Sequence, residues 1–375
     1  MRIDTSKHAV FPVEVMNQIF RSSVLDSITL ARCCLLSRRY LPSARKWLYR
    51  DVEVKLRRFY VDGSRGEQSV FEYSRPTAKL IAAILEKPAL GRLIRRTEFS
   101  VTYRSFSQSG FRTRGGEAVA TMLELAPTMS ALALGYGETY SATDNWLDEA
   151  LPQIQFDRSH SLRELSLTNM TETASEFVSN LPNLRHLAVR YIQAQTVQYQ
   201  LKTTNLETFS MEYVLADFDL QYFISHSAPT IRNLCIPFSK LVEVELEVYP
   251  RLGRVELVLP LGHCSDEDPL NGKMFYRFFE ECANLVTIAF NGCTLQSDVG
   301  DVVFGRSGGL GDSEWPSPQL RRVEFVDDVS IDQLLLFLRT DGLVSELAVT
   351  SNVTPKKMKL VRTLCEDSGV ELILL

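Results

Sequence analysis

A short apolar pattern that returns along most of the chain constrains the fold more than any other feature of the sequence. In three stretches, which begin at Leu162, Leu184 and Leu206, apolar residues occupy the first, fourth and sixth places, and the starts are 22 residues apart twice in succession. A period of about 20 to 50 residues is typical of stacked repeats, in which one unit cannot bury its apolar face alone. The fourth and sixth places alternate like a strand with one buried face. The pattern therefore predicts a repeat array with one strand in each repeat.

The pattern extends in both directions, with steps of 25, 21, 33, 35 and 24 residues after Leu206. The two long steps contain polar, Gly- and Pro-rich stretches at 262–272 and 300–318, which we expect to form loops. The further triplets are Met129/Leu132/Leu134, Ile231/Leu234/Ile236, Leu252/Val255/Leu257, Leu285/Ile288/Phe290, Leu320/Val323/Phe325, Val344/Leu347/Val349 and, weakly, Ile94/Thr97/Phe99. Helices are expected at 78–86, 115–125, 146–151, 174–180, 218–225, 273–282 and 331–338. This alternation predicts an α/β fold with a parallel sheet and right-handed crossovers, and the alternative is an α/β domain whose strand spacing is coincidental.

The pattern resembles leucine-rich repeats over about three quarters of the chain. The resemblance implies an irregular solenoid, with parallel strands on a concave face and helices on a convex face. In that family the ninth place holds Asn or Cys, whose side chain satisfies backbone groups in the turn. Cys293 and Asn352 fit, whereas Met170 and Ile192 are apolar, so we expect an irregular turn ladder.

The residues before the repeats, 8–52, predict three short helices. Pro12 suits the start of the first helix, where its missing N–H is harmless, and Met16 and Phe20 lie on one helical stripe. Asp26 or Ser27 can cap a second helix, and Trp47 belongs to a third. Three such helices make too small a core to be stable alone, so they must lean on the repeats or on a partner.

The order of motifs in this head resembles the F-box. The matching stretches are Phe11-Pro12 with Glu14, Val15-Met16 and Ile19-Phe20 at the opening, Leu36-Ser37-Arg38-Arg39-Tyr40 in the middle and Leu48-Tyr49-Arg50 at the close. The resemblance implies packed helices that bind the small acidic linker subunit of SCF-type ubiquitin ligases and, through it, a cullin. It assigns linker binding to Phe11, Pro12, Val15, Met16, Ile19, Phe20, Leu36 and Tyr40. Under this interpretation Met16→Asp abolishes linker binding, because it buries an unpaired charge.

The charge distribution is compatible with an acidic partner for the head. Residues 1–60 carry 12 Lys and Arg against 5 Asp and Glu, while the whole chain has a formal net charge of −5. A basic head on an acidic body suggests an acidic partner. The acidic total argues against a general nucleic-acid binder, which needs a basic face.

We divide the chain into an F-box-like domain at 8–52, a linker and cap helix at 53–90, and a repeat domain at 91–375. Residues 51–56 alternate as an edge strand does, and 57–75 are expected to form a linker or long loop. Thr77 can cap the helix predicted at 78–86. The first repeat strand is expected at 92–101, and a surface loop is expected at 105–116. Residues 370–375 are expected to form a last strand that covers the array.

Neither the cysteines nor the N-terminus indicates secretion. The 7 cysteines form no CxxC pair, which favours a reduced protein in the cytoplasm or nucleus. No basic segment followed by an apolar run marks a signal peptide, and the longest clean apolar run is too short to span a membrane. We therefore expect no membrane partner.

No residue pattern indicates catalysis, a metal site or a cofactor. Ser307 lies in a GxSxG pattern after an apolar run, but the residues after it are not helical, as a hydrolase requires. The 5 histidines are scattered and form no metal-ligand pair, and Asp266-Glu267-Asp268 lacks the spacing of a calcium loop.

The leading hypothesis is a non-enzymatic substrate-recognition subunit of an SCF-type ubiquitin ligase. Its repeats would bind a substrate protein through outward strand residues: Arg163, Glu164, His186, Arg190, Glu207, Glu212 and Asn233. One alternative is a leucine-rich-repeat interaction scaffold, without a ligase role, whose helical head only caps the array. Another is a hydrolase that uses Ser307.

Overall fold

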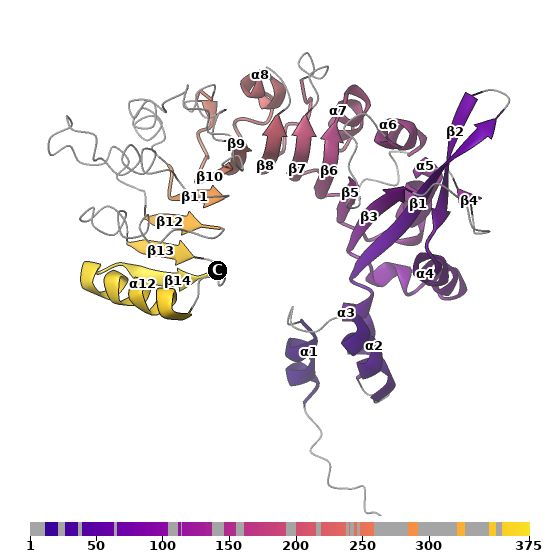
Figure 1. Ribbon diagram of the computed structural model, residues 1–375, viewed down its shortest axis with the longest axis horizontal. Coiled ribbons are helices and arrows are strands. Elements are labelled where there is room, and N and C mark those ends of the chain that lie inside the picture. Colours follow the sequence, from indigo (N-terminus) through magenta and orange to yellow (C-terminus); the bar gives the residue numbers. More distant parts are fainter. Residues whose placement is uncertain are drawn as a thin grey trace, which may run out of the picture. The chain divides into compact units, whose positions relative to one another are not determined.

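The structure of this protein is a computed structural model that separates into two compact units, Met1–Ser166 and Leu167–Leu375. It describes residues 12–21, 27–36, 40–63, 66–103, 112–113, 115–136, 146–154, 161–192, 200–214, 219–237, 240, 244–245, 248–258, 284–291, 321–326, 345–349 and 355–375. The helices predicted at 273–282 and 331–338, the two insertions and Ser307 lie outside these residues. Figure 1 labels the elements of both units.

The first unit contains a mixed sheet in the order β4-β2-β1-β3-β5. Its strands are β1 (Asp51–Gly63), β2 (Gly66–Tyr73), β3 (Arg96–Tyr103), β4 (Arg112–Thr113) and β5 (Ala131–Tyr136). Strands β1, β3 and β5 are parallel, whereas β2 pairs antiparallel with β1 and with β4. The remaining elements are α4 (Arg75–Glu86), η2 (Gly91–Leu93), α5 (Gly115–Leu125), α6 (Trp146–Ala150) and η3 (Leu151–Gln153).

The linker predicted at 57–75 is wrong, because these residues form most of a β-hairpin. Strand β1 continues to Gly63 and turns back as β2, so β1 lies between two strands and is not an edge. The charged residues in this stretch concealed the strand. Arg58 is buried and its guanidinium lies 5.6 Å from the centre of the Phe71 ring, while Phe59 and Phe71 belong to the core. A cation that packs on an aromatic face can occupy an inward position of a strand.

Two boundaries near this hairpin also differ from the prediction. Helix α4 begins at Arg75, and its cap is Ser74, whose Oγ accepts a hydrogen bond from the Thr77 N–H. The Thr77 hydroxyl instead accepts the Lys55 N–H at 3.0 Å and so ties the helix to β1. The loop predicted at 105–116 is wrong in part, because β4 pairs with β2 and α5 begins at Gly115.

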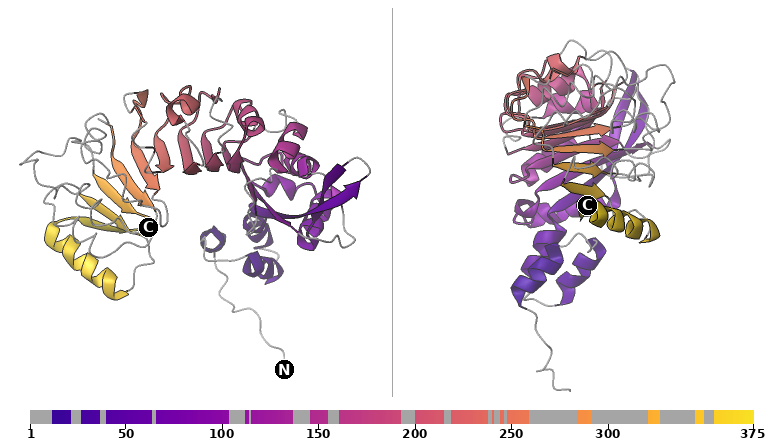
Figure 2. Two further views of the ribbon diagram at one scale, coloured as in Figure 1. Left: turned by 45° about the horizontal axis from the view of Figure 1, so that its top comes forward. Right: turned by 90° about the vertical axis from the view of Figure 1, so that its left-hand side faces the viewer.

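Three helices form a small group at the N-terminal side of the first unit, as predicted: α1 (Val13–Arg21), α2 (Ser27–Leu36) and α3 (Leu41–Leu48) (Figures 1 and 2). Phe20, Leu30 and Ala44 form their shared core. Met16, Cys33, Cys34, Tyr40, Trp47 and Leu48 pack around that core.

The second unit is a parallel sheet whose strands follow one another in sequence order from β7 to β14. Its strands are β7 (His186–Ile192), β8 (Thr208–Val214), β9 (Asn233–Pro237), β10 (Arg254–Val258), β11 (Thr287–Asn291), β12 (Arg322–Phe325), β13 (Glu346–Val349) and β14 (Glu371–Leu374). Strand β6 (Glu164–Met170) spans the boundary between the units. The last strand, predicted at 370–375, is confirmed as β14.

The helices of the second unit begin where the sequence offers a cap. Thr171 caps α7 (Glu172–Ser179) by accepting the Ala174 N–H, and Asp219 caps α8 (Leu220–Ile224) by accepting the Tyr222 N–H. Figure 1 shows α7 and α8 on the same side of their neighbouring strands. A further helix, α12 (Pro355–Ser368), precedes β14 and was not predicted.

The predicted triplets are confirmed as core positions. Every triplet residue that the structure describes is less than 9% exposed, including the weak triplet at Ile94, Thr97 and Phe99. In the second unit the fourth and sixth places face the helices, as the packing of Phe209 on Phe223 of α8 shows. The alternate third, fifth and seventh places lie on the opposite side of the sheet, which we call the open face.

A regular hydrogen-bond ladder runs through the turns that precede the strands. In most of these turns the carbonyl at the second place of one repeat accepts two consecutive N–H groups from the next repeat. Within the second unit Arg185 O accepts from Glu207 and Thr208, and Arg232 O accepts from Gly253 and Arg254. In the first unit Arg50 O accepts from Arg95 and Arg96, so the ladder begins at the end of the helical head, one strand earlier than the repeat predicted at 92–101. The ninth place carries buried apolar side chains in Met170 and Ile192, whereas Cys293 and Asn352 lie outside the described residues.

Candidate functional site

The helical head exposes a group of large apolar side chains, which we call the head surface: Val15, Ile19, Ile28 and Leu35. Their exposed fractions are 38%, 40%, 61% and 86%. Val15 and Ile19 are one turn apart on α1, and Ile28 and Leu35 are two turns apart on α2, so each pair shares a helix face. Exposed apolar groups of this kind mark interaction sites more often than single scattered residues do.

The structure separates the residues predicted for linker binding into surface and core. Pro12, Val15 and Ile19 are exposed. Phe20 is 3% exposed, and Met16 and Tyr40 pack against it, so these three support the head from inside. Phe11 lies outside the described residues, and the side chain of Leu36 is not among those described. The sequence missed Ile28 and Leu35, although their spacing on one helical face could have indicated them.

Basic side chains dominate the described part of the head. It contains Arg21, Arg32, Arg45, Lys46 and Arg50, against the two acids Glu14 and Asp51. Trp47 has two of these cations over its ring, at 5.8 Å for Lys46 and 4.8 Å for Arg50. A groove of about 410 Å³ beside this ring is lined by Asn17, Gln18, Arg21, Pro42, Ser43, Lys46 and Trp47. An acidic partner segment would find both charge and an aromatic face there.

The residues predicted for substrate binding occupy different environments. Arg163 and Glu164 are exposed at the end of the first unit. On the open face of the second unit, His186 and Asn233 lie in one row through Thr208, and the Asn233 amide donates to the Thr208 hydroxyl at 3.2 Å.

The remaining predicted residues form ion pairs. Arg190 and Glu212 pair at 3.3 Å on adjacent strands of the open face. Glu207 lies in the turn before β8 and pairs with Arg185, so it belongs to the edge of the sheet and not to its face. Next to the Arg190 pair, Tyr191 and Tyr213 stack with ring centres 5.2 Å apart.

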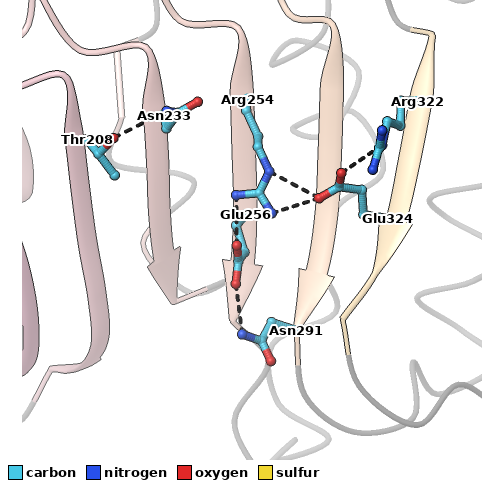
Figure 3. Close-up of polar contacts among 7 residues, drawn as sticks. All are labelled: Thr208, Asn233, Arg254, Glu256, Asn291, Arg322 and Glu324. Carbon is cyan, nitrogen blue, oxygen red and sulfur yellow. Dashed lines mark hydrogen bonds and ion pairs between the residues drawn. The ribbon is translucent and has the colours of Figure 1, made fainter. Parts of the chain in front are cut away.

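A polar network that the sequence analysis missed occupies the open face from β10 to β13 (Figure 3). Arg254 Nε and Nη2 donate to one oxygen of Glu324, at 3.1 and 2.8 Å, and Nη1 lies 2.8 Å from Glu256. Arg322 Nε lies 2.7 Å from the other Glu324 oxygen, and the Asn291 amide donates to Glu256 at 2.8 Å. Glu346 of β13 extends the network, 3.7 Å from Arg322.

Small side chains on β11 allow Arg254 to reach a carboxylate two strands away. Register places Thr287 beside Arg254 and Ala289 between Glu256 and Glu324. Because neighbouring strands are about 4.8 Å apart, the guanidinium must cross roughly 10 Å of sheet, which a long side chain between β10 and β12 would not permit. The signal was present in the sequence, since all these residues occupy the third, fifth or seventh place of their repeats.

The carboxylates of this network stabilise the charge of Arg254. Burial alone would lower the pKa of Arg254, but the hydrogen bonds that it donates to Glu324 and the nearby Glu256 carboxylate raise that pKa above its usual value. The carboxyl side chain of Glu324 is only 10% exposed and contacts both arginines. Because this carboxylate bridges both arginines across three strands, the polar side chains of the open face between β10 and β13 are held in one arrangement.

Replacing Glu324 is expected to destabilise the second unit. Glu324→Ala leaves Arg254 and Arg322 without their shared partner, and breaking a buried pair of this kind costs about 3 kcal/mol. The matched control is Glu212→Ala, whose partner Arg190 is half-exposed, and we expect a loss below about 1 kcal/mol there. Urea unfolding, followed by circular dichroism, measures both values, and equal losses would contradict a special role for the network.

A half-buried thiol, that of Cys235, lies on the same face. Burial, together with the nearby Glu256 carboxylate, raises the pKa of Cys235 from 9.0 to about 12, while a hydrogen bond with Ser210 and the Arg254 charge act in the opposite direction. Because the thiolate is the reactive form, alkylation of Cys235 by iodoacetamide at pH 8 should be about a thousandfold slower than in the urea-unfolded chain. Peptide mass mapping after timed quenching tests this, and rapid labelling of the folded protein would contradict the raised pKa.

The described part of the chain contains no group of three metal-binding side chains. Among the described helices, none is long and apolar enough to cross a membrane. No protein-family model and no curated protein matches the sequence. The described side chains form two candidate interaction surfaces. One is the head surface, on helices that also carry exposed basic residues, and the other is the polar open face of the second unit.

Proposed function

We propose that this chain is the substrate-recognition subunit of an SCF-type ubiquitin ligase, built from an F-box-like head and divergent leucine-rich repeats. In this role the head binds the acidic linker subunit and, through it, a cullin. The open face of the second unit binds a substrate protein. The observation that carries the proposal is the head surface, with four exposed apolar side chains on two of the three helices that share one small core, in a strongly basic setting.

The head surface is suited to a protein partner because it combines apolar anchors with charge. Leu35 at 86% exposure and Ile28 at 61% gain most from burial, and a few such residues provide most of the affinity of an interface. Burying a leucine side chain stabilises a complex by about 2 kcal/mol. The five basic residues of the head would attract an acidic protein and accelerate its association.

The open face supplies a second, independent surface for the substrate. Its polar side chains are fixed by register and by ion pairs, which lowers the entropy lost on binding. The turn ladder and the step-by-step order of β7 to β14 support a repeat array, since each strand bonds to the next in the chain. In this role the chain contributes proximity to ubiquitin transfer, which makes the reaction effectively intramolecular.

Direct binding of the full-length chain to a purified acidic linker subunit tests the proposal. We expect a one-to-one complex on size-exclusion chromatography. Its affinity should fall as the salt concentration rises, because the basic side chains of the head are exposed and salt screens their attraction to an acidic protein. Absence of a complex at low salt would reject the ligase role and favour the interaction scaffold, in which the helices only cap the array.

A further inference from the structure

Strand β14 is the outermost described strand of the second unit, and one of its sides has no partner among the described strands. The N–H groups of Glu371 and Leu375 donate to Ser345 and Val349, at 2.8 and 2.9 Å, so the odd-numbered residues bond toward β13. Main-chain groups of successive strand residues point to opposite sides. The N–H and C=O groups of Leu372 and Leu374 therefore point to the free edge.

The apolar core is open at the same edge. Leu374 pairs in register with the buried Val349, yet 53% of its surface is exposed, and Leu372 is only half-buried. Leu375, which follows Leu374, is also exposed, at 45%. Apolar side chains therefore line the outer side of β14, the outermost of the described strands.

The charges on α12, which packs on β14, suit a second copy of the same chain. Lys359 and Arg362 are exposed in its first part, and Glu366 and Asp367 are exposed in its last turn. Two copies of such a helix attract each other when they lie side by side in opposite directions, because each basic half then faces an acidic half.

We propose that β14 pairs antiparallel with β14 of a second copy about a two-fold axis at Ile373. Leu372 of each copy then exchanges two main-chain hydrogen bonds with Leu374 of the other copy, so the dimer gains four such bonds. The pairing also covers the exposed leucine side chains at this edge. A two-fold axis makes the interface self-complementary. This is edge-to-edge strand addition, which exposed edges favour.

The same axis aligns the charges of the two helices. Helix α12 runs back over β14, and Ile373 lies about 7 Å along the strand from Glu371. A length of about 7 Å corresponds to four to five helix residues. Counted back from the end of α12 at Ser368, this places the axis near Leu364. Arg362 of one copy then faces Glu366 of the other, twice in each dimer.

Charge reversal in complementary pairs tests this arrangement by sedimentation velocity on the full-length chain. We expect the parent chain to sediment at twice the mass of one chain at concentrations on the order of 10 µM or above. Arg362→Glu and Glu366→Arg should each remain monomeric, because each places like charges opposite one another. An equal mixture of the two variants should recover the dimer, since opposite charges meet again at both contacts, and this recovery also shows that both variants are folded.

A backbone variant tests the strand pairing separately. Leu374→Pro removes an N–H that points to the free edge and leaves the bonds to β13 intact, so it should abolish the dimer while the circular dichroism spectrum stays unchanged. Arg251→Glu, an exposed residue of the same unit, is the control and should still dimerise. A monomeric parent chain at about 100 µM, dimers of either single charge variant, or a mixture that stays monomeric would overturn the proposal.

Discussion

Leu35→Asp is expected to abolish binding of the acidic linker subunit, with a loss of affinity of at least about a hundredfold. The side chain is 86% exposed on α2, so the substitution places a charge in solvent in the free protein and costs little stability. In the complex the same charge would be buried without a partner and would also repel an acidic protein. Isothermal titration with purified linker subunit measures the loss.

The matched control is Leu85→Asp on α4, where the leucine is 63% exposed in the same unit but outside the three head helices. It makes the same chemical change and should leave the affinity within about twofold. Equal affinities for Leu35→Asp and the parent chain would remove α2 from the interface. Met16→Asp, which the sequence suggested, is a poorer test, because Met16 packs on the head core and its replacement would unfold the head.

The sequence predicted the repeat core accurately because period and burial have one physical cause. A residue that must face the helices recurs at the same place in each repeat, and the register of neighbouring strands keeps it there. Leu165, Leu187 and Phe209 were identified in this way, and all three are buried. The α/β class and the parallel order of the strands followed from the same pattern.

The prediction failed where local composition and tertiary role disagree. Arg58 is buried in β1 against the Phe71 ring, so a charged stretch was assigned to a loop. Helix α12 was missed because its many charges hide the inward positions Val361 and Cys365, which are four residues apart and buried. In both cases the burial of a few residues determines the structure, and an average over the segment does not show it.

The candidate surfaces were predictable only in part, for a different reason. Which apolar residues of a short helix face the core depends on how the three helices pack, and a stripe on α1 alone could not separate Phe20 from Ile19. The ion pair between Arg254 and Glu324 joins residues 70 positions apart in the sequence. It depends on the small Ala289, which lies between Glu256 and Glu324 on the intervening strand. The contact between these distant residues can be predicted only after the register of three strands is fixed.

Gly91→Ala is expected to destabilise the first unit by about 3 kcal/mol or more, since overpacking against rigid backbone is costly. Gly91 lies in η2, and an added Cβ would be 1.8 Å from the carbonyl oxygen of Leu125, the last residue of α5, and 3.1 Å from Ile84 of α4. A carbonyl oxygen at a helix end cannot move aside as a flexible side chain can. The helix end or the turn must therefore shift, which would disturb the core around Ile84. Urea unfolding followed by tryptophan fluorescence, with hydrogen exchange to assign the loss to the first unit, measures the effect.

Gly253→Ala provides the control for this experiment, because the same methyl group there finds ordinary contact. The nearest atoms to a Cβ at Gly253 are the carbonyl oxygens of Arg232 and Asn284, both at 4.0 Å. The N–H of Gly253 donates to Arg232 in the turn ladder, and alanine keeps that donor. The variant should therefore lie within about 0.5 kcal/mol of the parent chain, and a small gain would follow from the reduced entropy of the unfolded chain. Comparable losses in the free energy of unfolding at both positions would contradict this explanation. The close approach of α5 to η2 would then not be the reason that the fold requires glycine at Gly91.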